Sequence, residues 1–489
     1  MTTLADMLSG VTTPPASSAP RGAFTIDAPA PDLQLPLYDF QCEALEFIVQ
    51  RRRAYIAYDM GLGKTPIGIA TAARIAANGG KTLIVVPSSL RTNWKREITK
   101  FAPHLTVEVL VGKTPHALSD VDVYVIGEAV LQYWQVPLVG HVQAVIADEA
   151  HFYKNKNAKR TKALQAISAS VDGVVVLMSG TPIPNGRHEE LAPQIEVLGS
   201  EAWAGIGGKG KFWNTYCPPD PSGYGRQSCD NVGLNKAMTA SFMLRRRRDE
   251  VIELPNKGRS VISIESDAGS ARTYRRMEAD FIAWLAENDG NVAGAMRAEA
   301  LMKMNALRKQ SGTCKIKGTV DHVKNILDND TTGVFIVAEH RDVMTQLYLA
   351  LQSYNPVSVA GGMSDAEKQH AIDSFTSGQS RVLIGQIKAA GTGLTLHGGG
   401  LNRRVVVAQL PWSPSDLVQA EDRLHRIGQT ADVEVEIALS HIENEWTIDE
   451  RLWSQLEIKA FSSASTVDGN GQYLIGDDSI SGGVLDTYR

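Results

Sequence analysis

The sequence predicts an α/β protein with two parallel sheets, each covered by helices on both faces, plus helical insertions. Short runs rich in β-branched residues alternate with stretches of helical periodicity, which is typical of parallel α/β architecture. These runs form two series, separated by a segment of about residues 200–325 that lacks strong strand signals. At 489 residues the chain is long enough for two domains with separate cores.

The apolar runs define the strands that we expect in each sheet. The first series comprises residues 54–58, 82–86, 107–111, 121–126, 144–147 and 174–178. The second series comprises residues 333–338, 357–360, 381–385, 403–408 and 433–439. Between strands, Leu90, Trp94, Ile98 and Phe101 recur at the spacing of one apolar helix face.

Composition changes set the expected domain limits. Residues 1–30 and 461–489 are rich in small and polar residues without sustained periodicity, so we predict flexible tails there. The remaining chain divides into the following predicted parts: a first lobe over 31–258 with a helical insertion at about 200–250, and a second lobe over 259–460 with a helical insertion at about 268–325.

The overall composition excludes several classes of protein. Hydrophobic residues make up 43% and charged residues 21%, close to the averages of globular proteins. No apolar run approaches the ~20 residues that cross a bilayer, and no leader peptide is visible, so we expect an intracellular protein without a membrane partner. The four scattered cysteines form no C-x-x-C pair, which argues against a disulfide framework and a zinc site. The net charge of -5 means that nucleic acid would have to bind local basic patches.

Residues 59–65, "DMGLGKT", have the context of a phosphate-binding loop because they follow a predicted strand and precede a helical pattern. Backbone N–H groups from Gly61 to Thr65 can form an anion-binding nest at the helix N-terminus. Lys64 would then reach the β- and γ-phosphates, and the Thr65 hydroxyl would bind Mg²⁺. Tyr58 stands where the full pattern has glycine. The alternative is therefore a strand–helix turn without a ligand.

An acidic pair, Asp148 and Glu149, ends the strand in "VIADEAH". Phosphoryl transfer to water needs a carboxylate to hold Mg²⁺ and a group to orient the water. We assign Asp148 to the metal and Glu149 to the water. An isolated pair of this kind is more often a solvated strand end, but its place a few strands after a phosphate loop favours catalysis.

The segment "QAEDRLHRIGQ", residues 419–429, contains Arg423 and Arg426. If it is helical, both arginines lie on one face and can point at a phosphate held by the other lobe. They would stabilise the transition state only when the lobes close, which couples hydrolysis to motion. The alternative is a surface helix with salt bridges to Glu421 and Asp422.

Taken in order, these motifs resemble the Swi/Snf-type helicase-like ATPases of superfamily II over about residues 35–460. The resemblance rests on "LPLYDFQ", "DMGLGKT", "VIADEAHFYKNKNAKRTKAL", "LMSGTPIPN", "FMLRRRRDEVIELP", "GTGLTL" and "PWSPSDLVQAEDRLHRIGQT". The segments "VVPSSLRTNW" and "FWNTYC" are most similar to the SMARCAL-like annealing-helicase branch. The charge run at 244–248 matches a family signature. Because such runs are usually solvated helix faces, we expect a solvated face there, and a direct DNA contact is the alternative.

The resemblance implies two RecA-like lobes with ATP and Mg²⁺ in the cleft and a nucleic-acid duplex across both. Members commonly lack the first glycine of the loop, which removes the objection at Tyr58. The implied nucleotide-binding residues are Gln41 (reading the adenine), Asp59, Met60, Gly61, Leu62, Gly63, Lys64, Thr65 and Gly391. The implied coupling or nucleic-acid path consists of Ser179, Gly180, Thr181, Thr392, Gly393, Trp412 and Gln419.

We therefore expect a DNA-dependent ATPase that moves along duplex or branched DNA, with fork remodelling or strand annealing as its task. The alternatives are an RNA or DNA strand-separating helicase and a non-catalytic DNA-binding scaffold that retains the fold. Expected partners are DNA and replication or repair proteins, and the protein is expected to be a monomer. Its compartment would be the cytoplasm or nucleoid of a bacterium, a virus-infected host cell, or a eukaryotic nucleus.

Overall fold

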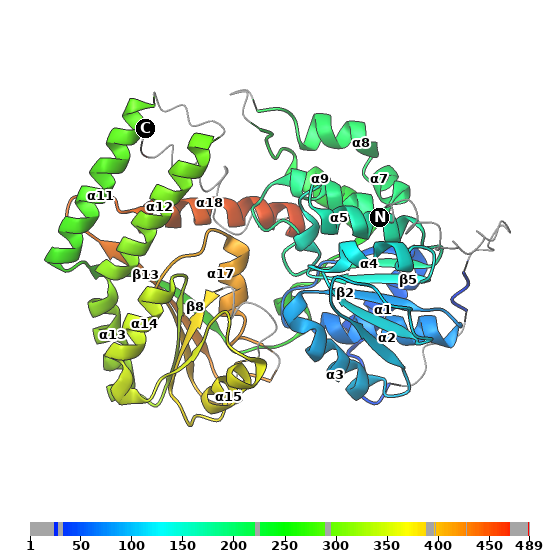
Figure 1. Cartoon of the computed structure of the whole chain (residues 1–489), viewed down its shortest axis with the longest axis horizontal. Helices are drawn as coiled ribbons and strands as arrows, with labels where there is room; N and C mark the ends of the chain where they lie inside the picture. Colours follow the sequence, from blue (N-terminus) through cyan, green and yellow to red (C-terminus); the bar gives the residue numbers. More distant parts are fainter. Residues whose placement is uncertain are drawn as a thin grey trace, which may run out of the picture.

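The computed structural model describes residues 24–27, 33–220, 225–288, 295–387, 396, 398–426, 428–469 and 488. Two α/β lobes lie side by side (Figure 1), each built on one sheet, which confirms the predicted fold class. Within both sheets, all neighbouring strands are parallel. Gly391, Thr392 and Gly393 lie outside the described residues, as do most residues of the two predicted tails.

The first lobe contains a seven-stranded sheet with the order β3-β4-β2-β5-β6-β1-β7. Its strands are β1 Arg53–Ile56, β2 Thr82–Val86, β3 Val107–Leu110, β4 Val123–Gly127, β5 Ala144–Asp148, β6 Val174–Met178 and β7 Met243–Leu244. Its helices are α1 Asp39–Arg51, α2 Lys64–Ala77, α3 Arg91–Phe101, α4 Leu131–Leu138, α5 Lys159–Ala169, α6 Ala192–Leu198, α7 Ser200–Gly205, α8 Gly208–Lys211, α9 Asn231–Ser241 and α10 Arg248–Val251.

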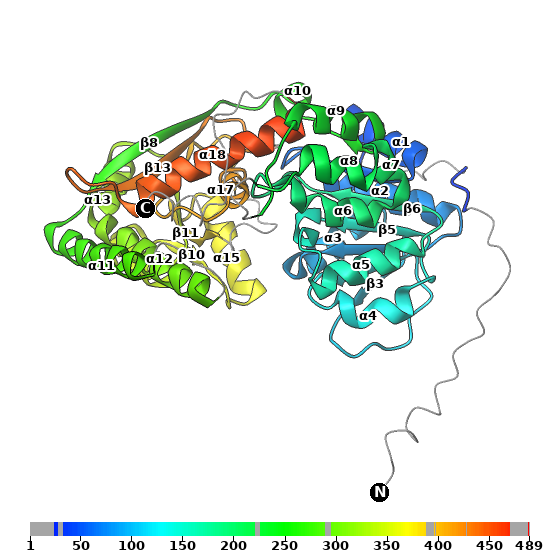
Figure 2. The ribbon, with the colours of Figure 1, turned by 90° about the horizontal axis from the view of Figure 1, so that it is seen from above.

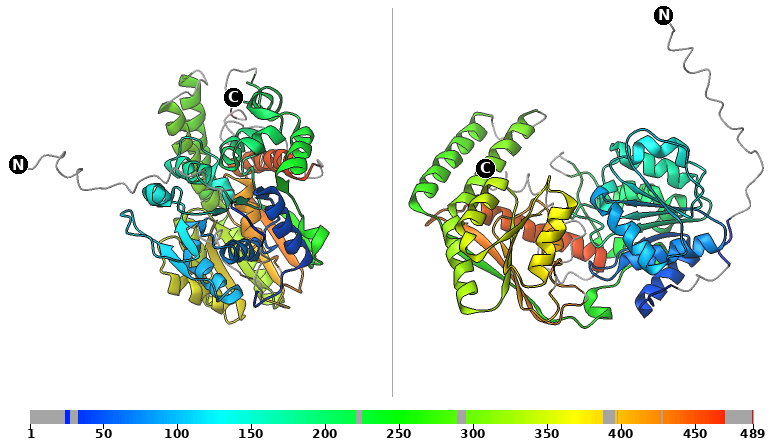
Figure 3. Two further views of the ribbon diagram at one scale, coloured as in Figure 1. Left: turned by 90° about the vertical axis from the view of Figure 1, so that its right-hand side faces the viewer. Right: turned by 60° about the horizontal axis from the view of Figure 1, so that its bottom comes forward.

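The second lobe contains a six-stranded sheet with the order β10-β11-β9-β12-β13-β8. Its strands are β8 Lys257–Glu265, β9 Gly333–Ala338, β10 Val357–Val359, β11 Val382–Gln386, β12 Arg403–Val407 and β13 Val433–His441. Its helices are α11 Ala268–Glu287, α12 Ala295–Cys314, α13 Ile316–Asn329, α14 Arg341–Ala350, α15 Asp365–Thr376, α17 Pro414–Glu421 and α18 Ile448–Asp468. Figure 3 shows from two further sides that the green pair α11 and α12 projects from this lobe.

Alternating side chains of the central strands form two apolar layers in each lobe, because successive residues of a strand point to opposite faces. In the first lobe, Leu83 belongs to the cluster that contains Trp134 of α4, whereas Ile84 belongs to the cluster that contains Trp94 of α3. In the second lobe, Phe335 and Ile336 divide in the same way. The central strands of each sheet are therefore buried on both faces, which explains why they are continuous apolar runs.

The segment of about residues 200–325, in which the sequence shows no strong strand signal, contains the strands β7 and β8. β8 lies at the edge of the second sheet and pairs with β13 along its whole length, from Lys257 opposite Val433 to Glu265 opposite His441. Of the nine residues in this fully described strand, Ile264 alone is buried. An edge strand with both faces largely exposed lacks the apolar run by which buried strands are recognised.

Helix α18 crosses from the second lobe to α9 of the first lobe, as the view from above shows (Figure 2). The predicted tail from residue 461 was wrong as far as Asp468, since α18 continues to that residue and Val467 joins the core of the first lobe. The predicted tail over residues 1–30 was also wrong at residues 24–27, where Ile26 is buried. Within the described ranges, no helix is long and apolar enough to cross a membrane.

Candidate active site

The loop "DMGLGKT" connects β1 to α2, as its predicted context requires. Gly61 and Gly63 adopt φ angles of +84° and +69°, in the left-handed region that favours glycine. A side chain at Gly63 would also bring its Cβ within 2.4 Å of the Gln41 amide nitrogen. These glycines turn the chain sharply into α2, so that the loop and the N-terminus of α2 border a cavity.

Gln41 and Lys64 both bond backbone carbonyls of the loop. The Gln41 amide is buried and donates to Leu62 O at 3.2 Å and Gly63 O at 3.3 Å. Gln41 therefore supports the loop from α1, and its predicted contact with adenine stays a prediction. The Lys64 Nζ atom donates to Tyr58 O at 2.8 Å and Asp59 O at 3.0 Å. Burial lowers the pKa of Lys64, opposed by the charges of the nearby acidic pair.

Asp148 ends β5 and is held by two hydrogen bonds. Its Oδ2 atom accepts from the Trp94 indole nitrogen at 3.0 Å, and its Oδ1 atom accepts from the Glu149 backbone nitrogen at 3.0 Å. Burial, together with the neighbouring charge of Glu149, raises the pKa of Asp148. Asp148 and Thr65 line the same cavity. Their carboxylate and hydroxyl oxygens are hard donors that fit Mg²⁺.

Glu149 has a backbone φ of 49°, which is uncommon outside glycine and is found at strained functional positions. Its Oε2 atom lies 3.2 Å from His151 Nδ1. Burial alone would favour the neutral acid, but His151, Lys64 and Arg423 together lower the pKa of Glu149. The two adjacent acids thus have pKa values shifted in opposite directions, and Glu149 carries the more stable negative charge.

Arg423 and Arg426 line the same cavity from the second lobe, but the helix on which they were expected to share a face does not reach them. α17 ends at Glu421, and both arginines lie in the turns that follow. Arg426 packs on the loop, with its Cγ 3.7 Å from the Cβ position of Gly61. Burial and the repulsion from Arg426 lower the pKa of Arg423 to about 9. A bound anion would relieve this repulsion.

The acids of the predicted alternative, Glu421 and Asp422, form ion pairs with basic residues of other elements. Glu421 pairs with Lys257 and Arg259, and Asp422 pairs with Arg248 and Lys257. The cavity itself has a volume of about 580 Å³. Its walls come from the phosphate loop, α2, α3 and the end of β5 in the first lobe, and from α15 and the turns after α17 in the second lobe.

A chain of polar contacts leads from Glu149 to the second lobe. His151 Nδ1 lies 3.1 Å from Ser179 Oγ, and that oxygen accepts from the Thr181 backbone nitrogen at 3.1 Å. The Thr181 hydroxyl lies 2.9 Å from the hydroxyl of Ser415, in α17 of the other lobe. The predicted coupling residues Ser179 and Thr181 therefore lie between the acidic pair and the lobe interface.

Gly180, Gln419 and Trp412 occupy three other positions near this interface. A Cβ at Gly180 would lie 2.7 Å from the Met60 side chain, so the glycine packs against the phosphate loop. The buried Gln419 amide donates to Ser415 Oγ at 3.3 Å. Trp412 does not line the cavity at the phosphate loop but a second cavity of about 820 Å³, which has residues of both lobes in its wall.

The cavity at Trp412 combines cationic and aromatic side chains from both lobes. Trp203, Trp213 and Trp412 line it, and Arg308 lies 4.3 Å from the centre of the Trp412 ring. Its basic residues are Lys154, Lys156, Arg187, Lys209, Arg226 and Lys459. Three of them form ion pairs with acidic residues of the same cavity: Lys154 with Glu190, Arg187 with Glu189, and Lys209 with Glu196.

Sequence reasoning did not find three contact residues of the phosphate-loop region: Trp94, Arg245 and Arg248. Trp94 was assigned only to an apolar helix face, although a buried indole usually needs an acceptor for its N–H group. The arginines belong to the charge run at 244–248, for which a solvated helix face was expected. That expectation was wrong for Arg248, whose guanidinium donates to Met60 O at 2.7 Å and to Asp422 Oδ2 at 2.7 Å.

Two protein-family models match most of the chain. The family model described as SNF2-related domain matches residues 40–316, and the one described as Helicase conserved C-terminal domain matches residues 318–428. The DNA annealing helicase and endonuclease ZRANB3 of Bos taurus and that of Homo sapiens are each 30% identical over 465 residues, covering 90% of this chain and 41% of the relative. The SWI/SNF-related matrix-associated actin-dependent regulator of chromatin subfamily A-like protein 1 of Xenopus tropicalis is 28% identical, covering 89% of this chain and 45% of the relative.

The chain therefore spans less than half the length of these curated relatives. Among solved structures, the Sulfolobus solfataricus SWI2/SNF2 ATPase core in complex with dsDNA is 21% identical, with a TM-score of 0.41. The alignment covers 92% of this chain and 96% of that chain.

Proposed function

Because the chain belongs to the SNF2-related family of helicase-like ATPases, we propose that it hydrolyses ATP between its lobes and uses their relative motion to travel along DNA. One observation carries the proposal. The phosphate loop with Lys64 and the remote arginines Arg423 and Arg426 line the same cavity, one from each lobe. A nucleotide bound there would contact both lobes, so that its hydrolysis would change how they are held together.

The loop would bind the phosphates of ATP through its backbone N–H groups and the start of α2. The Lys64 ammonium would exchange its bonds to Tyr58 O and Asp59 O for bonds to phosphate oxygens. The Thr65 hydroxyl and the Asp148 carboxylate would hold Mg²⁺, which neutralises phosphate charge when it is bound. Trp94 would orient Asp148 by donating to the carboxylate oxygen Oδ2.

Glu149 and the two arginines would act on the reacting groups. The lowered pKa keeps Glu149 ionised, so its carboxylate accepts a hydrogen bond from the attacking water and orients that water. Arg423 and Arg426 would donate to the oxygens of the transferred phosphoryl group, where negative charge must be stabilised in the transition state. Their burial strengthens this interaction, because water does not screen it.

Movement of the second lobe would be communicated to the acidic pair through the contacts of Thr181. This residue joins Ser179, which contacts His151 beside Glu149, to Ser415 of α17. When the lobes shift, the Thr181–Ser415 contact changes length or breaks. The orientation of Glu149 would change with it.

The cavity at Trp412 supports DNA as the track. Its cations, including Lys156 and Lys459, can contact phosphates, and its tryptophans can stack on exposed bases. Phosphate groups would replace carboxylates such as Glu190 in the existing ion pairs. Contacts of this kind to the backbone imply salt-dependent binding with little sequence selectivity.

We further propose duplex or branched DNA, including forks, as the preferred substrate, and strand annealing or fork remodelling as the outcome of movement. The names of the ZRANB3 relatives support annealing as the outcome. A monomeric state, replication or repair partners, and the cellular compartment stay predictions from the sequence. The flexible tails and the predicted boundaries of the two lobes also stay predictions from the sequence.

The experiment that tests this function measures ATP hydrolysis without nucleic acid and with single-stranded DNA, duplex DNA, forked DNA or RNA. We expect stimulation by duplex or forked DNA, and its loss in Lys64→Ala and Glu149→Gln. Lys95→Ala is the matched control, because this exposed lysine of α3 lies outside the cavity wall. Strongest stimulation by RNA would contradict the choice of track, and full activity of the two site variants would contradict the mechanism.

A further inference from the structure

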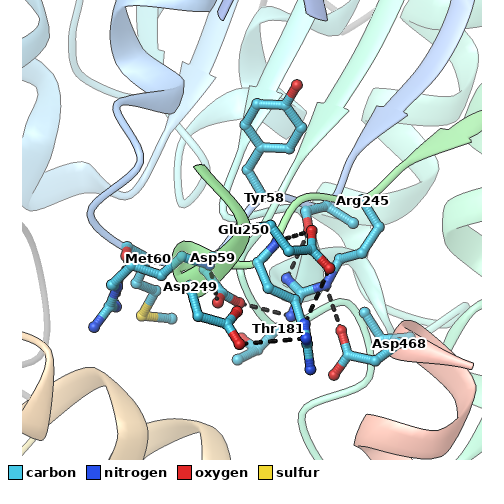
Figure 4. A network of polar contacts seen from close by, with 12 residues as sticks. Tyr58, Asp59, Met60, Thr181, Arg245, Asp249, Glu250 and Asp468 are labelled. Atoms are coloured by element: carbon cyan, nitrogen blue, oxygen red, sulfur yellow. Dashed lines mark hydrogen bonds and ion pairs between the residues drawn. The ribbon is translucent and has the colours of Figure 1, made fainter. Parts of the chain in front are cut away.

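Arg245 connects Asp59, at the start of the phosphate loop, with Asp468, at the end of α18 (Figure 4). Its Nη1 atom donates to Ala57 O at 2.7 Å, its Nη2 atom lies 2.6 Å from Asp59 Oδ1, and its Nε atom donates to Asp468 Oδ1 at 2.6 Å. The side chain is 13% exposed. Each partner occupies a different nitrogen of the planar guanidinium group. A lysine, with a single ammonium nitrogen, cannot reproduce this arrangement.

One partner of Arg245 is the first residue of the phosphate loop. Besides its bond to Arg245, the Asp59 carboxylate accepts from the Arg248 backbone nitrogen at 2.9 Å. The carbonyl oxygen of Asp59 accepts from Lys64 Nζ at 3.0 Å. Arg245 therefore holds the residue whose backbone positions the phosphate-binding lysine.

Another partner of Arg245 is the last residue of α18. Asp468 places a negative charge at a helix C-terminus, where the helix dipole disfavours anions. Its side chain is 8% exposed and forms an ion pair with Arg245. The next residue, Gly469, has φ +72°, and a Cβ there would lie 2.5 Å from Asn235 Oδ1 of α9. The end of α18 thus has a defined position on the first lobe that helix stability does not explain.

The two ends of α18 are anchored in different lobes. In the second lobe, the Thr447 hydroxyl that caps the helix donates to Ser440 O of β13 at 2.8 Å. In the first lobe, the Ser462 hydroxyl donates to Gly186 O at 2.8 Å, and Asn235 Nδ2 donates to Val467 O at 2.8 Å. A single 21-residue helix therefore spans the interface. A displacement of the second lobe must either move Asp468 or break these contacts.

We propose that Arg245 is a positioning residue for ATP hydrolysis, which ties α18 to the phosphate loop through Asp468 and Asp59. When DNA draws the lobes together, α18 would shift and Arg245 would pass that shift to Asp59 and so to Lys64. The inference rests on the ATPase function proposed above. Without Arg245, Asp59 still donates its backbone N–H to Arg246 O, and its carboxylate still accepts from the Arg248 backbone nitrogen, so nucleotide binding persists and the response to DNA is lost.

The test uses the full chain and compares ATP hydrolysis with and without duplex DNA. Asp468→Asn keeps the shape of the side chain and removes its charge. We expect the DNA-stimulated kcat to fall by about five-fold or more, while the KM for ATP changes by less than about two-fold. Arg245→Lys should lose at least as much stimulation. The matched control is Asp249→Asn, which removes an equivalent charge from the 68% exposed partner of the neighbouring Arg247 and should behave as the wild type.

A double variant tests whether Asp468 and Arg245 act together or independently on the DNA-stimulated rate. If Asp468 acts through Arg245, then Asp468→Asn should cause no further loss in the Arg245→Ala background. Additive losses would overturn the inference, as would wild-type stimulation in Asp468→Asn. An equal fall of the DNA-free and DNA-stimulated rates together with a lower Tm by circular dichroism would also overturn it, because that is the behaviour of a purely structural residue. A wild-type chain without ATPase activity would instead refute the proposed function itself.

Discussion

The hydrogen bond from Trp94 to Asp148 predicts how one indole nitrogen affects the metal dependence of hydrolysis. Replacing Trp94 by Phe removes the N–H donor that lies 3.0 Å from Asp148 Oδ2 and leaves an aromatic ring in the same buried position. Trp134→Phe is the matched control. Its indole is equally buried and donates to Gly112 O at 3.1 Å, but it lies on the opposite face of the sheet, outside the cavity wall.

The size of the effect follows from the charge of the acceptor. A hydrogen bond to a charged group contributes about 1.5–3 kcal/mol, which corresponds to about ten-fold to a hundred-fold in an equilibrium constant. The bond from Trp94 favours the ionised carboxylate, and its loss raises the already raised pKa of Asp148 further. A protonated Asp148 cannot hold Mg²⁺. At pH 7, raising a pKa of about 6 by about one to two units leaves a smaller fraction of Asp148 ionised, so we expect the half-saturating Mg²⁺ concentration of Trp94→Phe to rise by about two-fold to fifteen-fold.

The assay is the steady-state rate of DNA-stimulated ATP hydrolysis at fixed ATP over a series of Mg²⁺ concentrations. Both Phe variants lose packing, so both should unfold at a lower temperature than the wild type. Trp94→Phe alone should require more Mg²⁺, and saturating Mg²⁺ should restore much of its rate. Equal half-saturating Mg²⁺ concentrations in the two variants would refute the assignment of Asp148 and its partner Trp94.

Three further predictions concern stability, coupling and DNA binding. Burial lowers the pKa of His188 to about 4 in the folded state, against 6.5 in the unfolded state. Between these pH values the unfolded state binds more protons than the folded state. The free energy of unfolding should therefore fall by about 3 kcal/mol as the pH drops from about 6.5 to about 4. Urea unfolding should show a shallower pH dependence over this range in His188→Gln, and an unchanged slope would contradict the assignment. Thr181→Val removes the hydroxyl contact to Ser415 and should lower DNA-stimulated ATPase activity by about five-fold. Adding Ser415→Ala to Thr181→Val should cause no further loss, and additive losses would argue against the contact. Lys156→Gln should reduce the slope of log affinity for duplex DNA against log salt by about one, measured by fluorescence anisotropy, and an unaltered slope would exclude a phosphate contact.

The sequence predicted the parts of the fold that depend on local pattern. The buried strands, such as β2 and β9, appear as apolar runs with the same limits in the sequence and in the structure. The edge strand β8 has no such run, because solvent rather than a helix covers most of its side chains. α18 was underestimated because small polar residues such as Ser462 resemble a flexible tail. In the structure, that hydroxyl bonds Gly186 O of the other lobe.

The sequence allowed candidate site residues to be proposed where a motif and the chemistry it requires coincide, as for Lys64 and Glu149. It did not reveal contacts between residues that lie far apart in the chain. The turns that carry Arg423 and Arg426 are shaped by the ion pair of Asp422 with Arg248 and by the bond between His425 Nε2 and Pro255 O, which no local periodicity reveals. The same holds for Arg245, whose partners Asp59 and Asp468 lie about two hundred residues away on either side.

The central claim is that a nucleotide held by the phosphate loop is hydrolysed only when the arginines of the second lobe act on it. Single-turnover hydrolysis of radiolabelled ATP in the presence of duplex DNA tests this claim most directly, with ATP binding measured on the same samples. Arg426→Ala should bind ATP with an affinity close to that of the wild type and hydrolyse it about a thousand-fold more slowly, as expected for an arginine that stabilises transition-state charge. Hydrolysis by Arg426→Ala at the wild-type rate would contradict the account.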